Sequence, residues 1–228
     1  MIYHRKSCRS FTQTPVDAKT IEAIRGFSMK PLYPDVQVQW DIVPWEQVRC
    51  LCPFTSPQVI TIYSQEKEGY LENVGFLFQQ MDLYLQTLGL GVCWLGLARM
   101  RPKWAKEIPD MGFVIMLAFG YPKGDMLRHD VKEFKRNPLD KIADMVDPKL
   151  EPVRLAPSAV NSQPWYFAHR KDALDVYCTF NKRLRYMNRI DMGIALAHLY
   201  VANTETFRFF KTDAPEKDGA HYIGSVHI

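Results

Sequence analysis

The chain of 228 residues lacks several features that would assign it to a broad class of proteins. No apolar run approaches the ~20 residues of a membrane-spanning helix, so we expect no membrane segment. No long apolar stretch follows the basic residues at the N-terminus, so we expect no signal peptide. The formal net charge is only +4, and no basic run is interleaved with aromatic residues, which argues against nucleic-acid binding.

Cysteine is scarce and irregularly placed. The count of five is odd, which argues against a disulfide framework and favours a reducing, cytoplasmic compartment. Cys50 and Cys52 form a C-x-C pair, but no further ligands stand at a suitable spacing, so we predict no metal site. Nothing beside Cys8 or Cys93 in the sequence indicates an activated thiol, so we predict no nucleophilic cysteine.

The apolar residues, which make up 47% of the chain, are arranged as in an ordinary globular protein. Alternating or β-branched runs predict strands at 36–45, 58–64, 112–122 and 220–228, and a hairpin over 164–180. Helical periodicity, with caps and stops, predicts helices at 15–26, 71–91, 101–109, 134–146 and 189–210. Because helices and hairpin-like strands are both present, the expected fold class is α+β.

The sequence also contains a degenerate repeat. Residues 5–17 and 128–140 both fit R-[KH]-x-x-[RK]-x-F-x-x-x-P-[VL]-D without a gap. Further along, "NVGFLF" at Asn73 matches "DMGIAL" at Asp191, and each opens a long apolar helix. We predict two copies, residues 1–124 and 125–228, packed through their long helices like the subunits of a dimer.

The two copies differ where a ligand would bind. Copy one begins with "RKSCR", whereas copy two has Asp130 in place of Ser7, and a carboxylate there would repel an anion. Copy one has the glycine-containing stretch "LGLGVCWLG", and copy two has the loop "APSAVNSQPW". Each copy therefore keeps a different part of a site, and we predict one complete site formed by both copies.

These segments together suit a planar cofactor that carries a phosphate. Arginine, lysine and a serine hydroxyl can bind phosphate oxygens, glycine lets the backbone approach a flat ring, and amides suit a polar ring edge. Each segment alone has a structural alternative. "RKSCR" could be a solvated basic start, "GLGVCWLG" a helix stop followed by core residues, and "APSAVNSQPW" a capped turn over a buried Trp165.

Four of these stretches resemble the flavin-dependent nitroreductase superfamily. They are "RKSCRSF", "LGLGVCWLG", "FGYP" and "APSAVNSQPW". In the usual member the last loop follows the N-terminal segment by a few dozen residues, whereas here it comes much later. The sequence is therefore similar to the branch in which two subunits are fused into one chain, as in nitroreductases first known from a thermophile.

The resemblance implies an FMN site and assigns residues to it. Arg5, Lys6 and Ser7 would hold the phosphate, and Arg9 would lie near the N1 and O2 edge of the flavin. Ring contacts would come from Trp94, Leu95 and Gly96 of copy one and from Pro157, Ser158, Ala159 and Asn161 of copy two. Lys135 and Arg136 are further candidates for the phosphate, although they could equally be the head of copy two.

The implied activity is FMN-dependent oxidation of NADH or NADPH, with electrons passed to a nitroaromatic, a quinone or a similar small acceptor. We predict no catalytic protein side chain, because the flavin carries the chemistry. His198 is expected to be a core or interface residue. The alternatives are a flavin carrier or sensor with little turnover, and a flavin-free relic of the fold used for assembly. Either a monomeric pseudo-dimer or a homodimer is compatible with the sequence.

Overall fold

The computed structural model describes residues 1–180 and 182–228, which form two compact units. Unit 1 comprises Met1, Tyr3–Tyr70 and Met81–Val131, and unit 2 comprises Ile2, Leu71–Gln80 and Lys132–Ile228. Each unit contains one four-stranded sheet, so the predicted α+β class is confirmed. The division of the sequence into copies at 124/125 stays a prediction. No helix in the described part of the chain is both long and apolar enough to cross a membrane.

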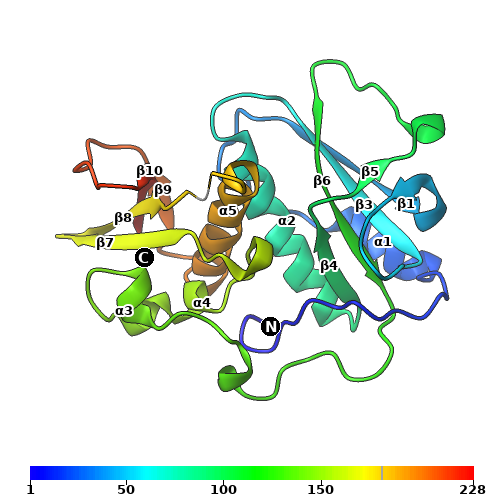
Figure 1. Cartoon of the computed structure of the whole chain (residues 1–228), viewed down its shortest axis with the longest axis horizontal. Helices are drawn as coiled ribbons and strands as arrows, with labels where there is room; N and C mark the ends of the chain where they lie inside the picture. Colours follow the sequence, from blue (N-terminus) through cyan, green and yellow to red (C-terminus); the bar gives the residue numbers. More distant parts are fainter. Residues whose placement is uncertain (181) are drawn as a thin grey trace. The chain divides into compact units, whose positions relative to one another are not determined.

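The sheet of unit 1 has the order β1-β3-β6-β4, with every neighbouring pair antiparallel (Figure 1). Its strands are β1 (Val38–Pro44), β3 (Gln58–Ser64), β4 (Gly91–Leu95) and β6 (Gly112–Gly120). A two-stranded ribbon pairs β2 (Val48–Arg49) with β5 (Arg99–Met100). Val59, Cys93 and Ala118 lie on one face of the sheet and belong to a buried apolar cluster with Phe11. This cluster anchors the N-terminal segment to the sheet.

The outer edge of β1 is protected by a side chain. Trp45 N donates to Pro57 O and Gln65 N donates to Gln37 O, so in this antiparallel pair the odd-numbered residues bond to β3. The N–H of Ile42 therefore faces away from β3, and it donates to Asp41 Oδ1 at 2.8 Å. A side-chain acceptor at this position blocks pairing with another strand, which is one way in which proteins keep sheet edges from aggregating.

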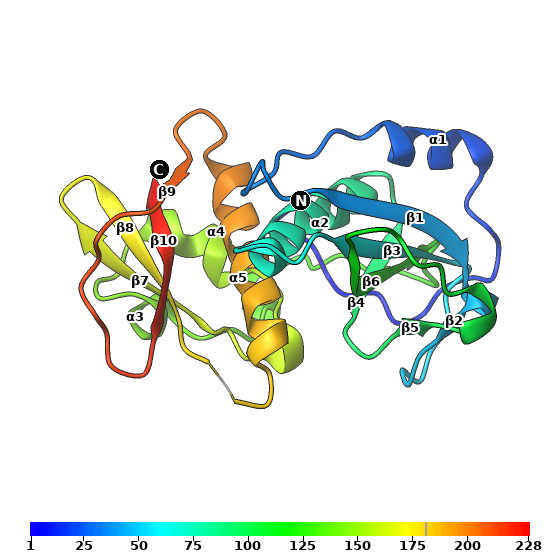
Figure 2. The same cartoon turned by 90° about the horizontal axis from the view of Figure 1, so that it is seen from above.

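Unit 2 has a second antiparallel sheet with the order β7-β8-β10-β9 (Figure 2). Its strands are β7 (Trp165–Arg170), β8 (Ala173–Cys178), β9 (Arg208–Phe210) and β10 (His221–His227). The helices that lie wholly in this unit are α3 (Leu139–Ile142), α4 (Glu151–Arg154) and α5 (Arg185–Ala202). In the described ranges 1–180 and 182–228, short 3-10 turns occur at Trp45–Gln47, Pro102–Trp104, Val131–Glu133, Pro148–Leu150 and Ala159–Asn161.

Two glycines let α2 (Tyr70–Thr87) and α5 touch backbone to backbone within unit 2. A Cβ atom on Gly75 would lie 2.1 Å from Ile190 O, and one on Gly193 would lie 1.9 Å from Glu72 O. Gly75 therefore faces the carbonyl of Ile190, which is three residues before Gly193. In the same way, Gly193 faces the carbonyl of Glu72, which is three residues before Gly75. This reciprocity is typical of a contact about a two-fold axis. Nearby, Arg189 Nε donates to the buried carboxylate of Glu72 at 2.6 Å.

The structure confirms the predicted strands and the hairpin with small changes in their ends. The predicted helices differ more. Helix α1 (Ala18–Gly26) begins at Ala18 rather than at residue 15, because the Asp17 carboxylate accepts the Thr20 N–H and so caps the helix. Helix α2 ends at Thr87, since Gly89 has a φ of +75° and stops it.

Three further helix predictions were too long. The predicted helix over 101–109 is only the 3-10 turn Pro102–Trp104, and the one over 134–146 is only the single turn α3. Helix α5 starts earlier than predicted and stops at Ala202, so the final residues of the predicted helix form strand β9 instead. Strand β4 is not among the predicted strands, because Gly89 just before it and Gly91 at its start favour a helix stop and a platform.

Candidate functional site

The N-terminal segment predicted to bind phosphate runs beside β4 in unit 1. Ser7 forms a parallel bridge with Val92, and Cys8 N donates to Val92 O at 2.8 Å. Lys6 N donates to Gln86 Oε1 of α2 at 3.1 Å. These backbone bonds hold the segment in place without using the side chains of Lys6 and Ser7.

Arg5 lies at the base of this segment and is buried, with 1% of its surface exposed. Its guanidinium makes a fork with Asp82 of α2: Nε is 3.2 Å from Oδ1 and Nη2 is 3.1 Å from Oδ2. The Asp82 carboxylate also accepts from Gln86 Nε2. The charge of Arg5 is therefore balanced within the protein. Asp82 and Gln86 were not predicted, because both stand outside the recognised motifs and far from Arg5 in the sequence.

The other polar residues of the segment are closer to solvent. Lys6 and Arg9 are exposed and Ser7 is half-buried. The Ser7 hydroxyl accepts a long hydrogen bond of 3.4 Å from Arg5 Nη2, so the buried ion pair extends to the hydroxyl. The structure thus brings together four predicted residues, Arg5, Lys6, Ser7 and Arg9, as one cationic strip along β4.

The predicted ring contacts of copy one lie on the same strand. Trp94 and Leu95 are the last two residues of β4, and Gly96 follows directly. Leu95 is buried, whereas Trp94 and Gly96 are half-buried. Because Ser7 is paired with Val92 in a parallel bridge, the chain from Ser7 to Arg9 runs in the same direction as the chain from Val92 to Trp94. The predicted phosphate and ring residues of unit 1 are therefore neighbours.

The thiols around this strip are protonated at neutral pH. Burial raises the pKa of Cys8, and it raises the pKa of Cys93 to about 11, although Arg9 and Arg5 oppose the second shift. Burial and the neighbouring Cys50 raise the pKa of Cys52 to about 12. A thiol with a raised pKa is a poor nucleophile at pH 7. Among the described residues, no group of three or more His, Cys, Asp or Glu side chains could hold a metal ion.

The second predicted segment, the loop Ala156–Trp165, belongs to unit 2 and is held by its own hydrogen bonds. Ser158 Oγ accepts from Gln163 N at 2.9 Å. Gln163 Oε1 accepts from Asn137 N at 2.8 Å, and Gln163 Nε2 donates to Asn161 O at 3.2 Å. Pro157 and Trp165 are buried, while Ser158 and Ala159 are half-buried. The Ser158 hydroxyl therefore serves to shape the loop.

Arg136 and Lys135 are bound to this loop. Arg136 donates from Nε to Ala156 O at 3.0 Å and from Nη1 to Asn161 Oδ1 at 2.6 Å. Asn161 Nδ2 donates to Lys135 O at 3.0 Å. Both ends of the Asn161 amide are thus bonded within the protein. The structure gives Arg136 a positioning role in the loop, and the prediction that it reaches a phosphate stays a prediction.

The tip of the loop has an unusual backbone. Val160, Asn161 and Gln163 all have positive φ values, of 47°, 59° and 47°. A β-branched residue rarely adopts this left-handed region, so Val160 is strained, and 83% of its surface is exposed. The hydrogen bonds around the tip maintain this conformation. Strained backbone of this kind clusters at active sites and ligand-binding segments.

Asp191 of α5 is hydrogen-bonded to the backbone of the loop and was not predicted as a site residue. Its Oδ1 accepts from Ala159 N at 2.9 Å, and its Oδ2 accepts from Asn188 Nδ2 at 3.3 Å. The Asn188 amide also donates to Ser162 Oγ at 3.2 Å. Burial raises the pKa of Asp191 to about 7, although these hydrogen bonds oppose the shift. Its charge therefore changes near neutral pH.

We expect D191N to flatten the pH dependence of stability. A carboxyl with a raised pKa binds its proton more tightly in the folded state, so stability falls as the pH rises from about 4 through 7. At ~1.4 kcal/mol per pH unit, the free energy of unfolding of the wild type should lose about 2–3 kcal/mol from this group between pH 5 and pH 8. Urea unfolding at both pH values measures the difference, and an equal loss in D191N would contradict this assignment.

Comparisons with known proteins identify the family of this chain. The family model described as "Putative TM nitroreductase" matches residues 1–203. The crystal structure of "a putative nitroreductase" from Thermotoga maritima MSB8 is 23% identical, with a TM-score of 0.65, and the match covers 99% of this chain and 89% of that one. This similarity confirms the predicted nitroreductase-like fold. No curated protein sequence matches the chain significantly.

Smaller nitroreductases match about half of the chain. An FMN-dependent nitroreductase from Clostridium difficile R20291 is 16% identical, with a TM-score of 0.44, and the match covers 56% of this chain and 92% of that one. A nitroreductase with bound FMN from Bacteroides fragilis NCTC 9343 is 13% identical, with a TM-score of 0.43, and the coverage is 55% and 89%. The family model described as "Putative TM nitroreductase" spans most of the sequence, so this chain belongs to that nitroreductase family.

Proposed function

We propose that the chain binds FMN and uses it to oxidise NADH or NADPH, passing the electrons to a small acceptor such as a nitroaromatic or a quinone. Membership of the nitroreductase family supports an oxidoreductase. The observation that carries the proposal is the cationic strip Arg5–Arg9 beside β4, which combines two exposed cations with a hydroxyl.

The chemistry of this strip fits a phosphate group. The Arg5 charge is already matched by Asp82, so the charges of Lys6 and Arg9 are the ones available for a phosphate dianion. The Ser7 hydroxyl is fixed by Arg5 and supplies a neutral donor. Arginine, lysine and serine are the side chains that most often bind phosphate oxygens.

The protein side chains would bind the cofactor and set its electrostatic surroundings. Lys6 and Ser7 would hold the phosphate, and Arg9 would supply positive potential that favours an anionic ring system. Bound FMN would supply the hydride acceptance and electron transfer. Trp94 and Gly96, at the end of β4, would line the ring. No step in this scheme needs a protein acid, base or nucleophile.

The absorption spectrum of the purified protein, followed by assays of NADH and NADPH oxidation with menadione or a nitroarene, tests the proposal. Flavin bands together with turnover would support it. Flavin bands without turnover would favour the carrier or sensor. A colourless protein that takes up no FMN would contradict the proposal and favour the flavin-free alternative.

We expect S7D to weaken FMN binding by about tenfold to a hundredfold. The change removes a donor and places a carboxylate beside the phosphate, and a hydrogen bond to a charged group is worth ~1.5–3 kcal/mol. Fluorescence titration of the apoprotein with FMN measures the affinity. D130S is the matched control, because it changes the corresponding exposed position of the second copy and should leave FMN affinity unaltered.

The assignment of the loop residues is tested separately. N161A and S158A remove polar groups that shape the loop, so the proposal that the loop contacts FMN requires both variants to lower FMN affinity. R136M tests whether Arg136 acts through Asn161: its effect on FMN affinity should then not add to that of N161A. Variants with unaltered FMN affinity would remove the loop from the assignment and leave the N-terminal strip in place.

A further inference from the structure

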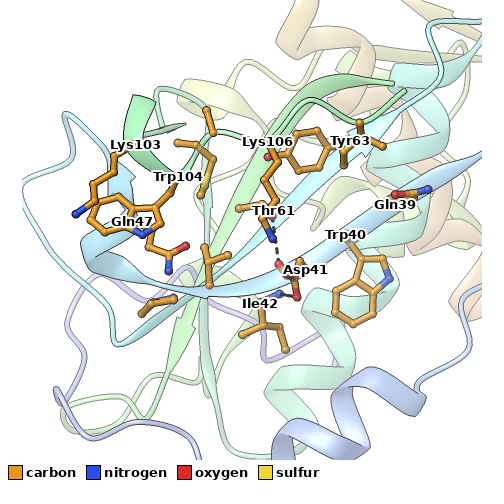
Figure 3. Close-up of a pocket in the computed structure, with 15 residues that line it drawn as sticks. Gln39, Trp40, Asp41, Ile42, Gln47, Thr61, Tyr63, Lys103, Trp104 and Lys106 are labelled. Atoms are coloured by element: carbon orange, nitrogen blue, oxygen red, sulfur yellow. Dashed lines mark hydrogen bonds between the residues drawn. The ribbon is translucent and has the colours of Figure 1, made fainter. Parts of the chain in front are cut away.

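Unit 1 contains a pocket of about 650 Å³ at the β1 edge of its sheet (Figure 3). Strands β1 and β3 form one wall, and the segment that follows β5 forms the other. In the sheet order β1-β3-β6-β4, this edge is opposite to β4, along which the Arg5–Arg9 strip runs. The pocket is therefore separate from the proposed FMN phosphate site, and its volume suits a small organic ligand.

Two aromatic side chains form walls of the pocket. Tyr63 comes from β3 and Trp104 from the 3-10 turn after β5. Both are half-buried, so part of each ring faces open space. Trp40 of β1 also borders the pocket, but the cross-strand partner of Tyr63 is Gln39, so the Trp40 side chain points to the opposite face of the sheet. The Tyr63 ring is held edge-on against Phe113, with ring centroids 5.7 Å apart. Flat walls of this kind favour a planar ligand, because stacked or edge-on rings are attracted beyond the effect of burial.

The charges at the pocket favour an anion. Lys103 and Lys106 line it and are exposed, and the described part of the chain provides no carboxylate ion pair for either. Figure 3 shows Lys103 beside Trp104 on one side and Lys106 extending toward Thr61 and Asp41 on the other. The Lys103 ammonium lies 5.0 Å from the centroid of the Trp104 ring.

The carboxylate in the pocket does not cancel these two charges. Asp41 pairs with Arg25 of α1 at 2.9 Å, and its Oδ1 also accepts the N–H of Ile42. The Asp41 charge is thus balanced from outside the pocket, and two lysine charges remain above an aromatic wall. Glu107 is exposed next to Lys106 in sequence but does not line the pocket.

We propose that this pocket binds a planar aromatic carboxylate, with its ring against Tyr63 and Trp104 and its carboxylate near Lys103 and Lys106. The side chain of Gln47 lines the same space and can donate a hydrogen bond to the ligand, whereas the Thr61 hydroxyl already donates to Asp41 O. The pocket gives the chain a ligand site in addition to the flavin site, and the proposal does not depend on FMN binding.

The test compares 2-naphthoate with 2-naphthamide, which has the same ring system without the charge. Titration of the protein as purified, followed by tryptophan fluorescence, should show naphthoate binding about tenfold more tightly than naphthamide, since a close ion pair adds about a factor of ten in such a site. Raising the salt concentration from 0.02 M to 0.5 M should reduce this preference. Equal affinities for the two probes would overturn the proposal.

The double variant K103M/K106M should remove the preference for naphthoate and leave naphthamide affinity and FMN content as in the wild type. The matched control K19M/K171M removes the same charge at exposed positions outside the pocket and should keep the preference. W104A should weaken both probes. A preference for naphthoate that survives in K103M/K106M would place the binding elsewhere and overturn the assignment.

Discussion

Gly193→Ala should lower the free energy of unfolding by about 3 kcal/mol or more, and Gly193→Val should leave little folded protein. The added Cβ would lie 1.9 Å from Glu72 O and 2.7 Å from Phe76 N. Both are backbone atoms of α2, so no side chain can rotate away and the two helices must separate. Whole domains are stable by only ~5–15 kcal/mol, so a loss of this size is large. Chemical denaturation followed by circular dichroism measures it.

Gly26→Ala is the matched control for this change. Gly26 is also a helical glycine, at the end of α1, but a Cβ there would meet no atom within 4 Å. Alanine at an unhindered helical position should change stability by less than ~1 kcal/mol, and toward greater stability. The reciprocal variant Gly75→Ala should behave like Gly193→Ala, because its Cβ would lie 2.1 Å from Ile190 O. Wild-type stability in either variant would contradict the close crossing.

Removing one partner of the Arg5–Asp82 pair is expected to have an effect of similar size. Asp82→Ala leaves the guanidinium of Arg5 buried, with 1% exposure and without its carboxylate partner. Breaking a buried ion pair from one side costs ~3–5 kcal/mol, whereas replacing both partners with apolar residues is often nearly neutral. The double variant R5M/D82L should therefore be more stable than D82A. Denaturant midpoints of the two variants test this order.

The exposed pair Arg25–Asp41 provides the comparison for this prediction. Both side chains are 50% exposed, so R25Q should change the free energy of unfolding by less than ~1 kcal/mol. A loss in R25Q as large as that in D82A would show that burial does not decide the strength of these pairs. FMN titration of D82A at a temperature where it remains folded would also show whether the ion pair positions Ser7.

The strands of this fold were predictable because their signal is local. The run 58–64 is rich in β-branched residues, and it forms β3 with the predicted ends. Helix lengths were less predictable. Apolar and aromatic residues after Ala202 continue a helical pattern, but the chain turns at Asn203 and Phe209 pairs with Val226 instead. Tertiary pairing overrides helical propensity in this segment.

The candidate site was predictable as segments but not as a network. Ser7, Trp94 and Asn161 could be selected because they stand in recognisable motifs. The partners Asp82 and Asp191 could not be selected, because each is far in sequence from the segment to which it binds. The separation is 77 residues between Arg5 and Asp82, and 32 residues between Ala159 and Asp191. The sequence around a helical carboxylate contains no local pattern that identifies a distant hydrogen-bond partner.

The path of α2 limits how this protein can be divided into fragments. Its segment Leu71–Gln80 belongs to unit 2, although it lies in the sequence between two stretches of unit 1. A gene truncated after Val131 would therefore encode the Leu71–Gln80 segment of α2 without the rest of unit 2, against which it packs. A gene beginning at Lys132 would encode α5 with Gly193 and the side chain of Arg189 stripped of their contacts. Expression of either half alone should yield insoluble material, so recombination within this gene would have to keep both parts together.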